Sequence, residues 1–387
     1  MKKILSIIVF LILLHTGCKD IYDPGIINPE TGYLVVEGFI NSGSEPTLIN
    51  ISRTAKLTDK IFYKPELNAR VIVEGDNNSS FNLMSTSPGF YSSGQPLTLN
   101  PEVKYRLKIN TANGGEYVSE YSPVVTTHPI DSITWKRENE GVQIYVNTRD
   151  ERTDQKAYYR WQYAETWEIR SSFLNNIKME FDENSQPLRV DYKFPDHSVD
   201  FSIFFCWQNY SSQNIILGST EKLSSNEVYL PITYIEPASI KIGVLYSIEL
   251  KQYALSKKAY DFYSQMKKNT EQIGTIFDPQ PSEMTGNIIN IKNPSEPVIG
   301  FVEVTSKQSK RIFISNNEVP LWGYRRICET VTIINNPEKI KEIADNVPAY
   351  AEQVSDDGII LTFAAAPATC VDCRTRGSNI KPSFWPN

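Results

Sequence analysis

The most constraining feature of this sequence is the alternation of large apolar and polar residues from Tyr159 to Ile169. Five apolar side chains share one parity: Tyr159, Trp161, Tyr163, Trp167 and Ile169. The opposite parity is polar, with Arg160, Gln162, Thr166 and Glu168. Because successive side chains of a strand point to opposite faces of a sheet, this period predicts a strand with one buried face. An aromatic face also suits a sugar-binding platform, but the polar opposite face favours a core position.

Upstream of this run, short predicted strands alternate with turn-forming residues. Asp76-Asn77-Asn78 and Asn113-Gly114-Gly115 tolerate positive φ, and Pro88-Gly89 sets a further turn. The predicted strands cover 33–40, 47–54, 69–74, 81–84, 104–109 and 117–121. Short strands at this density predict an immunoglobulin-like β-sandwich over residues 33–128.

Residues 129–387 predict a larger β-rich domain. Its strands are expected at 132–137, 141–148, 159–169, 288–291, 298–305, 311–315 and 358–363. One main helix is expected at about 256–273, because Ser256 is a suitable N-cap and apolar residues then recur every three or four positions up to Gly274. A shorter helix begins at Asn336-Pro337. The predicted fold class is therefore mainly β, with two domains and two helices.

The N-terminus has the pattern of an export signal. Lys2 and Lys3 precede an apolar run, Ile4 to Leu14, which is too short to span a membrane comfortably. Residues 1–17 are expected to be removed as a lipoprotein signal peptide. Cys18 would then be the first residue, and bacterial lipoproteins carry acyl chains on that cysteine.

The match to a lipoprotein signal is incomplete at one position. His15 stands where an aliphatic residue is usual, so an ordinary signal peptide with an incidental cysteine is the alternative. Residues 18–32 contain Pro and Gly without periodicity and are expected to form a flexible tether behind the lipidated Cys18.

Composition narrows the class of partner. The full chain has a formal net charge of −6 and becomes more negative when Lys2 and Lys3 leave with the signal. A negative chain without a basic cluster is a poor nucleic-acid binder. A hydrophobic content of 40% with 22% charged residues is typical of a folded globular protein.

Four cysteines remain once Cys18 is set aside: Cys206, Cys328, Cys370 and Cys373. In an oxidising compartment an even number predicts two disulfides, which can pair in three ways. A redox Cys-x-x-Cys motif and a zinc site are weaker alternatives. The residues after Cys373 lead into a Pro-containing tail, not a helix, and neither His128 nor His197 has a zinc-type spacing.

The sequence lacks the common catalytic motifs. It has no Gly-x-Ser-x-Gly, His-Glu-x-x-His, Walker loop or Gly-x-Gly-x-x-Gly, and few histidines. Glu165 and Glu168 are the obvious carboxylate pair for a glycosidase, but in a strand they point to opposite faces. We therefore expect no enzyme activity, no cofactor and no metal.

Two other features have a functional and a structural interpretation. Asp356-Asp357-Gly358 suggests a calcium ligand set, but Asp-Gly between two extended runs favours a hairpin turn. Trp322 and Trp385, near Gly and Pro, suit exposed binding aromatics or buried edge positions, of which the second is favoured.

The segments 269–282, 286–288 and 297–300 resemble the centre of the domain of unknown function 4249 family, lipoproteins of the Bacteroidota. The segments 34–38, 52–54 and 130–133 resemble the N-terminal half of that family, and the ending from Cys370 to Trp385 is similar to its C-terminal signature. The resemblance implies no catalytic residue. It implies an accessory lipoprotein of the outer membrane that works beside a TonB-dependent receptor in nutrient uptake.

Three functions follow as expectations. The first is a non-enzymatic lipoprotein, anchored to the outer membrane at the cell surface or at the periplasmic leaflet, that serves a TonB-dependent receptor barrel. The second is a surface adhesin or a protein that binds a glycan or peptide. The third is a carboxylate-based glycan hydrolase.

Overall fold

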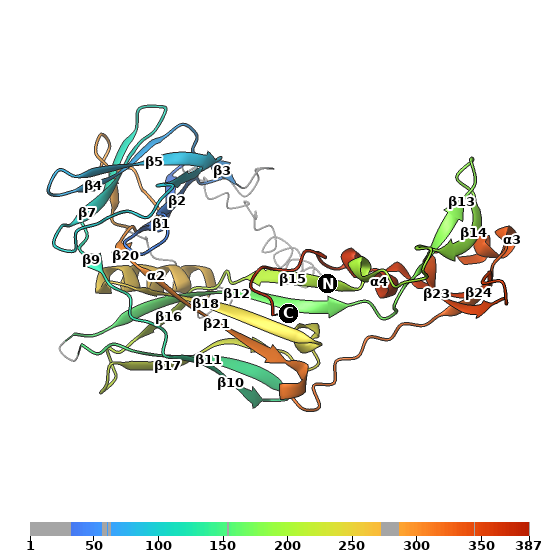
Figure 1. Ribbon diagram of the computed structural model, residues 1–387. Helices are drawn as coiled ribbons and strands as arrows, with labels where there is room; N and C mark the ends of the chain where they lie inside the picture. The colour runs from blue at the N-terminus through green and yellow to red at the C-terminus, as the bar shows by residue number, and fades with distance from the viewer. Residues whose placement is uncertain are drawn as a thin grey trace, which may run out of the picture.

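The computed structural model describes residues 32–55, 60, 63–152, 155–271, 286–343 and 345–386. The predicted mainly β class is confirmed: strands dominate, with one main helix and two short ones. Figure 1 shows three units, which we name the N-terminal sheet, the central sandwich and the distal module. The predicted signal peptide, Cys18 and residues 19–31 of the predicted tether lie outside the described residues.

The N-terminal sheet is a single curled sheet of eleven strands. In sheet order these are β19 (Ile288–Asn290), β8 (Glu116–Ser119), β7 (Tyr105–Asn110), β4 (Arg70–Gly75), β5 (Ser80–Ser87), β6 (Phe90–Ser92), β2 (Leu48–Arg53), β1 (Leu34–Asn41), β20 (Val304–Thr305) and β9 (Val124–Val125), with β3 (Lys64–Pro65) beside β2. The first half of β5 pairs with β4 and its second half with β6, so the sheet bends around its core there.

The immunoglobulin-like arrangement is not confirmed. Two strands of the sheet, β19 and β20, follow the main helix in sequence, and β20 lies between β1 and β9 with parallel pairing to both. The sequence predicts strands at 288–291 and 298–305, but no local pattern indicates that they pair with the N-terminal strands. The strand expected at 298–305 is correspondingly reduced to β20 and an isolated bridge between Ile299 and Val35.

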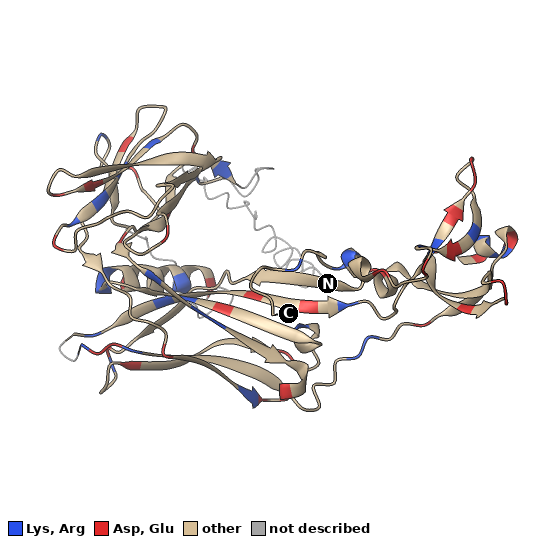
Figure 2. Cartoon of the chain, in the orientation of Figure 1, with Lys and Arg blue, Asp and Glu red and all other residues tan. Residues whose placement is uncertain are grey.

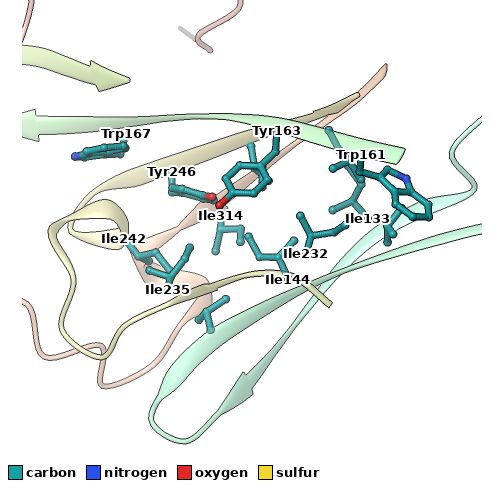
Figure 3. Close-up of a cluster of buried hydrophobic side chains, with 14 of the residues drawn as sticks. Ile133, Ile144, Trp161, Tyr163, Trp167, Ile232, Ile235, Ile242, Tyr246 and Ile314 are labelled. Atoms are coloured by element: carbon teal, nitrogen blue, oxygen red, sulfur yellow. The ribbon is translucent and has the colours of Figure 1, made fainter. Parts of the chain in front are cut away.

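The central sandwich packs two sheets face to face. One has the order β10 (Ser132–Glu138), β11 (Gly141–Arg149), β17 (Glu227–Ile235); the other has β15 (Phe205–Ser211), β12 (Tyr158–Arg170), β18 (Leu245–Ala254), β21 (Lys307–Ser315), with β16 (Ile216–Ser219) paired to the start of β12. Figure 3 shows the aromatic side chains of β12 in the core between them. Trp161 is fully buried and its Nε1 donates to Oε1 of Gln252 at 2.8 Å. The aromatic face is thus core.

The main helix, α2 (Lys257–Glu271), packs against one side of the central sandwich. The side chain of Ser256 accepts a hydrogen bond from the backbone N–H of Ala259 at 3.1 Å, which satisfies one of the free donors at the helix start. Ala259 and Phe262 form its buried stripe. The helix therefore matches its prediction up to Glu271, where the described segment stops.

The distal module extends from one end of the sandwich (Figure 1). It contains the hairpin β13 (Ile177–Phe181) and β14 (Pro187–Tyr192), and the sheet β22 (Val331–Ile334), β24 (Ile360–Pro367), β23 (Asn346–Val354). Its helices are α3 (Pro337–Ile340), which starts at the predicted Asn336 N-cap, and α4 (Ala368–Val371). The buried residues form two small clusters, so residues 129–387 contain more than one core.

Charged residues of both signs are interspersed in all three units (Figure 2). No helix within the described ranges is long and apolar enough to cross a membrane.

Candidate functional site

A cavity of about 380 Å³ lies between the N-terminal sheet and the central sandwich with α2; we name it the interdomain cavity. Its walls come from β1, β2 and β6 on one side, from β12, β18 and α2 on the other, and from the segment 300–305. The lining residues are Val36, Glu37, Gly38, Phe39, Leu48, Asn50, Phe90, Arg160, Gln162, Tyr253, Leu255, Phe262, Tyr263, Met266, Gly300, Phe301, Glu303 and Thr305. Its volume falls within the range of small-molecule sites, which often lie between domains.

Backbone pairing beside β1 places one wall of this cavity. Val36 donates its N–H to the carbonyl of Ile299 at 2.8 Å, and Ile299 donates to the carbonyl of Leu34 at 2.9 Å. Gly300 follows with a φ of +148°, and a Cβ there would stand 2.2 Å from the carbonyl oxygen of Val36. Only glycine fits this close approach. The pairing then turns Phe301 and Glu303 to the cavity.

Aromatic rings form much of the wall. Phe39 and Tyr253 meet edge to face with centroids 4.9 Å apart, and Phe262 lies 5.5 Å from Phe301. Burial raises the pKa of Tyr253 to about 12. Rings held in such contacts offer flat apolar surfaces with polar edges.

Two opposite charges also line the cavity without pairing to each other. The Arg160 guanidinium lies over the Tyr263 ring, with Cζ 4.5 Å from the centroid, and its buried Nε has no acceptor among the described residues. Glu303 is only 6% exposed and accepts the Ser256 N–H at 3.2 Å on each oxygen. Burial raises the pKa of Glu303, against the lowering effect of the bonds from Ser256. The cavity thus offers a cation and a carboxylate beside apolar rings.

A family model described as a domain of unknown function (DUF4249) matches residues 19–311, more than half of the chain. The chain belongs to the DUF4249 family. The matched span includes every residue that lines the interdomain cavity, whereas Cys328, Cys370 and Cys373 lie beyond it. The family's description assigns no activity to this cavity.

Other comparisons add little to the DUF4249 match. The comparison with curated proteins gave no match. Among solved structures, one match is a Bacteroides uniformis protein whose description proposes carbohydrate binding. It is 8% identical, covers 58% of this chain and 90% of its own, and has a TM-score of 0.13. So low a score carries no argument about fold or ligand.

The predicted cysteines of this DUF4249 protein form two disulfides. Cys206 pairs with Cys373, and Cys328 pairs with Cys370. The two cysteines of the Cys-x-x-Cys segment therefore have different partners and do not form a dithiol pair. Cys18, the expected lipidation site, lies outside the described residues.

The two carboxylates considered for a glycosidase lie on opposite faces of β12. Glu165 is 1% exposed and accepts from Lys241 Nζ at 2.6 Å and Tyr246 Oη at 2.7 Å. Glu168 pairs with Arg170 at 2.6 Å on the other face. They do not form a catalytic pair.

The remaining sequence candidates have structural roles. Trp322 is 4% exposed and donates to the Ser239 carbonyl, and Trp385 is 6% exposed. Residues 355–359 form the turn between β23 and β24. His128 contacts Asp150, and His197 stacks on a tyrosine ring. Within the described ranges, no group of three His, Cys, Asp or Glu side chains is placed to hold a metal ion.

Sequence reasoning missed Arg160 and Glu303 as site residues. The alternation predicts a strand whose polar face, with Arg160 and Gln162, is not the buried one. In fact the start of that face lines the cavity, while Thr166 and Glu168 further along are 4% and 7% exposed. The available signal was the Arg within an aromatic-rich strand, but its partner surface depends on distant segments.

Proposed function

We propose that this chain is a non-enzymatic binding protein, anchored to the outer membrane through Cys18, that holds a small polyhydroxylated ligand such as a sugar unit in the interdomain cavity. It presents this ligand to a TonB-dependent receptor. The observation that supports the binding role is that Arg160 and Glu303, neither of which forms an ion pair among the described residues, lie beside aromatic rings in one cavity.

The chemistry of the cavity favours a ligand with apolar faces and hydroxyl edges. The C–H face of a sugar ring packs on aromatic side chains such as Phe39 and Phe262. Its hydroxyls accept from the guanidinium of Arg160 and donate to the carboxylate of Glu303. A purely apolar ligand would bury the Arg160 guanidinium and the Glu303 carboxylate without a counter-charge and would leave the Arg160 Nε–H without an acceptor, which costs free energy.

The anchor and the partner are supported by sequence alone. The basic and apolar start of the chain followed by Cys18 supports lipidation. The resemblance to accessory lipoproteins supports a receptor partner, which would supply the pore.

Binding can be measured on the mature chain with Cys18→Ser, which keeps it soluble. A panel of mono- and disaccharides, with short peptides as a second class, is screened by ligand-observed NMR and confirmed by calorimetry. Arg160→Gln and Glu303→Gln should each weaken binding by about tenfold or more, because hydrogen bonds to charged groups contribute about 1.5–3 kcal/mol. Arg149→Gln, an exposed arginine paired with Glu227, is the matched control.

Three results would contradict the proposal. One is the absence of any ligand, and another is binding that neither cavity variant weakens. The third is turnover of a bound saccharide, which would favour the hydrolase. For the partner, the lipidated chain is purified in mild detergent, and failure to recover a barrel receptor with it would count against the delivery role. Adhesion of the intact chain to cells or matrix without a soluble ligand would favour the adhesin.

A further inference from the structure

A second, smaller cavity of about 160 Å³ lies where the central sandwich meets the distal module. It shares no lining residue with the interdomain cavity, which borders the start of β12, whereas this cavity borders its end. The end of β12, the segment before Leu245 and the C-terminal residues contribute to its lining. Three arginines line it, Arg170, Arg326 and Arg376, and of these Arg170 is paired with Glu168.

Neither Arg326 nor Arg376 is neutralised. The buried Nε of Arg326 and that of Arg376 have no hydrogen-bond acceptor among the described residues, and no described carboxylate forms an ion pair with either. The Nη2 of Arg376 donates to the backbone carbonyl of Arg170 at 2.7 Å. The Nη2 of Arg326 is 3.9 Å from the Sγ of Cys370, and sulfur is a weak acceptor. Tyr324 is a further hydrogen-bond partner of the Arg376 side chain. The two buried Nε–H groups are therefore the donors that remain for a ligand.

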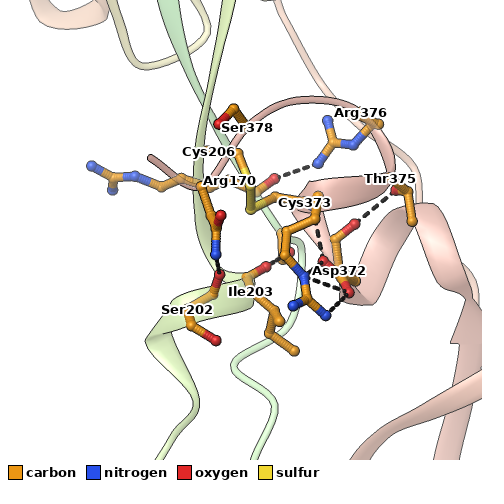
Figure 4. Close-up of a disulfide and its surroundings, with 12 residues drawn as sticks. Arg170, Ser202, Ile203, Cys206, Asp372, Cys373, Thr375, Arg376 and Ser378 are labelled. Carbon is orange, nitrogen blue, oxygen red and sulfur yellow. Dashed lines mark hydrogen bonds and ion pairs between the residues drawn. A yellow bond between two sulfur atoms is a disulfide. The ribbon is translucent and has the colours of Figure 1, made fainter. Parts of the chain in front are cut away.

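The two disulfides hold these arginines beside each other. Arg326 lies two residues before Cys328, which is bonded to Cys370. Arg376 lies three residues after Cys373, which is bonded to Cys206 on β15. Figure 4 shows the second disulfide with Arg376 directed to the Arg170 carbonyl. The cross-links therefore help to keep both guanidinium groups at one cavity.

The electrostatics of the pair are unfavourable without an anion. Burial lowers the pKa of Arg376, and the positive charge of Arg326 lowers it further, whereas Tyr324 acts in the opposite direction. The carboxylate of Glu168 also lines the cavity, but it is paired with Arg170 at 2.6 Å and accepts from Trp385 Nε1 at 3.4 Å. An oxyanion between the guanidinium groups would satisfy their free donors.

We propose that Arg326 and Arg376 form an anion-binding site for the carboxylate, sulfate or phosphate group of a ligand. The volume admits one such group. The shared chemistry has two sources, a free inorganic ion and the acidic group of a sugar. The rest of such a sugar would fit in a neighbouring cavity of about 720 Å³. That cavity shares four lining residues with this one: Glu168, Arg170, Gly243 and Val244. Trp207, whose buried Nε1 has no acceptor among the described residues, lines that larger space.

The test compares anions at constant ionic strength with the mature Cys18→Ser chain. The probes are sodium sulfate, sodium phosphate, glucuronate and glucose 6-sulfate. Sodium chloride is the reference anion, and glucose is the uncharged reference sugar. We expect at least one oxyanion to raise the thermal midpoint and to bind measurably by calorimetry. Stabilisation by inorganic ions identifies a free-ion site, and tighter binding of the acidic sugars identifies a saccharide site.

Variants of the two arginines distinguish a role in anion binding from a role in the stability of the fold. Arg326→Gln with Arg376→Gln should abolish the oxyanion effect and leave the thermal midpoint in chloride unchanged or higher, because the repulsion is removed. Arg376→Lys should retain part of the affinity, since it keeps the charge without the planar fork. Arg189→Gln, an exposed arginine of β14, should bind like the parent chain.

Two outcomes would overturn the proposal. One is an oxyanion effect no larger than that of chloride in the parent chain. The other is an oxyanion effect that persists in the double variant. Because Arg160→Gln and Glu303→Gln alter only the interdomain cavity, their behaviour with neutral sugars tests the proposed function separately.

Discussion

The N-terminal sheet and the distal module are stabilised in different ways. The N-terminal sheet buries eighteen apolar residues in one cluster, and its strands contain no cysteine. The distal module has clusters of only eight and five buried residues, and the Cys328–Cys370 disulfide lies there, whereas Cys206 and Cys373 belong to the core of the central sandwich. A small core contributes less burial than a large one, so covalent closure of the unfolded chain takes a larger share. We therefore expect the distal module to lose stability mainly when its disulfide is removed, and the N-terminal sheet to lose stability mainly when its core side chains are truncated.

The largest effect is expected from the disulfide within the distal module. Replacing Cys328 and Cys370 by Ala opens a link between residues 42 positions apart, which should cost about 4 kcal/mol on loop entropy. Hydrogen exchange should show lost protection in β22, β23 and β24. Equal loss of protection in the N-terminal sheet would contradict the division between the regions.

A core substitution in the N-terminal sheet should lower hydrogen-exchange protection in that sheet and not in the distal module. Ile51→Ala removes a fully buried side chain of β2 and should cost about 3 kcal/mol, with lost protection in the N-terminal sheet. Leu48→Ala on the same strand is the control, because Leu48 is 50% exposed and should change stability by less than about 0.5 kcal/mol. Chemical denaturation gives both values, and the difference between them should persist in reductant.

The seam between β1 and the segment at Gly300 should be sensitive to one added methyl group. Gly300→Ala meets both a positive φ and the Val36 carbonyl, so we expect a loss of more than about 2 kcal/mol. Gly94→Ala also has a positive φ, of +71°, but no atom within 4 Å, and should cost only about 1 kcal/mol. Thermal unfolding of the pair separates the close contact from backbone strain. Similar losses would show that the contact relaxes.

The smallest effect is the pH dependence contributed by Glu303. Its folded pKa is raised by burial, so its contribution to stability is fully present below the unfolded pKa of about 4.3 and is lost as pH rises through the folded value. Relative to Glu303→Gln, the parent chain should therefore become less stable as pH rises from about 4 to 8. Thermal midpoints of both chains across this range measure the difference, which should be a few degrees at most. A flat difference would refute the raised pKa.

Local patterns predicted much of the fold. The alternating run at 159–169 became β12 (Tyr158–Arg170), and the three-four spacing after Ser256 became α2. Each depends on the chain's own periodicity and capping. The burial of the polar face of β12 could not be predicted, because the segments that cover this face lie far away in sequence.

The candidate sites were harder to predict from the sequence than the helices and strands. Arg160 and Glu303 lie far apart in the chain. They line the same cavity only because β20 pairs with β1. Four cysteines allow three pairings, and spacing alone does not choose the one that brings Arg326 next to Arg376. Both cavities are products of long-range packing.

The position of β20 in the N-terminal sheet affects the order in which the chain can fold. Synthesis delivers β1 to β9 first, but the β1 edge has no partner until Val304–Thr305 has been made. During that interval the nascent sheet presents an open hydrogen-bonding edge, and closure requires contacts of high sequence separation. Fragments that end before residue 304 should therefore tend to pair between molecules, and a chaperone that shields this edge would raise the yield of the native protein.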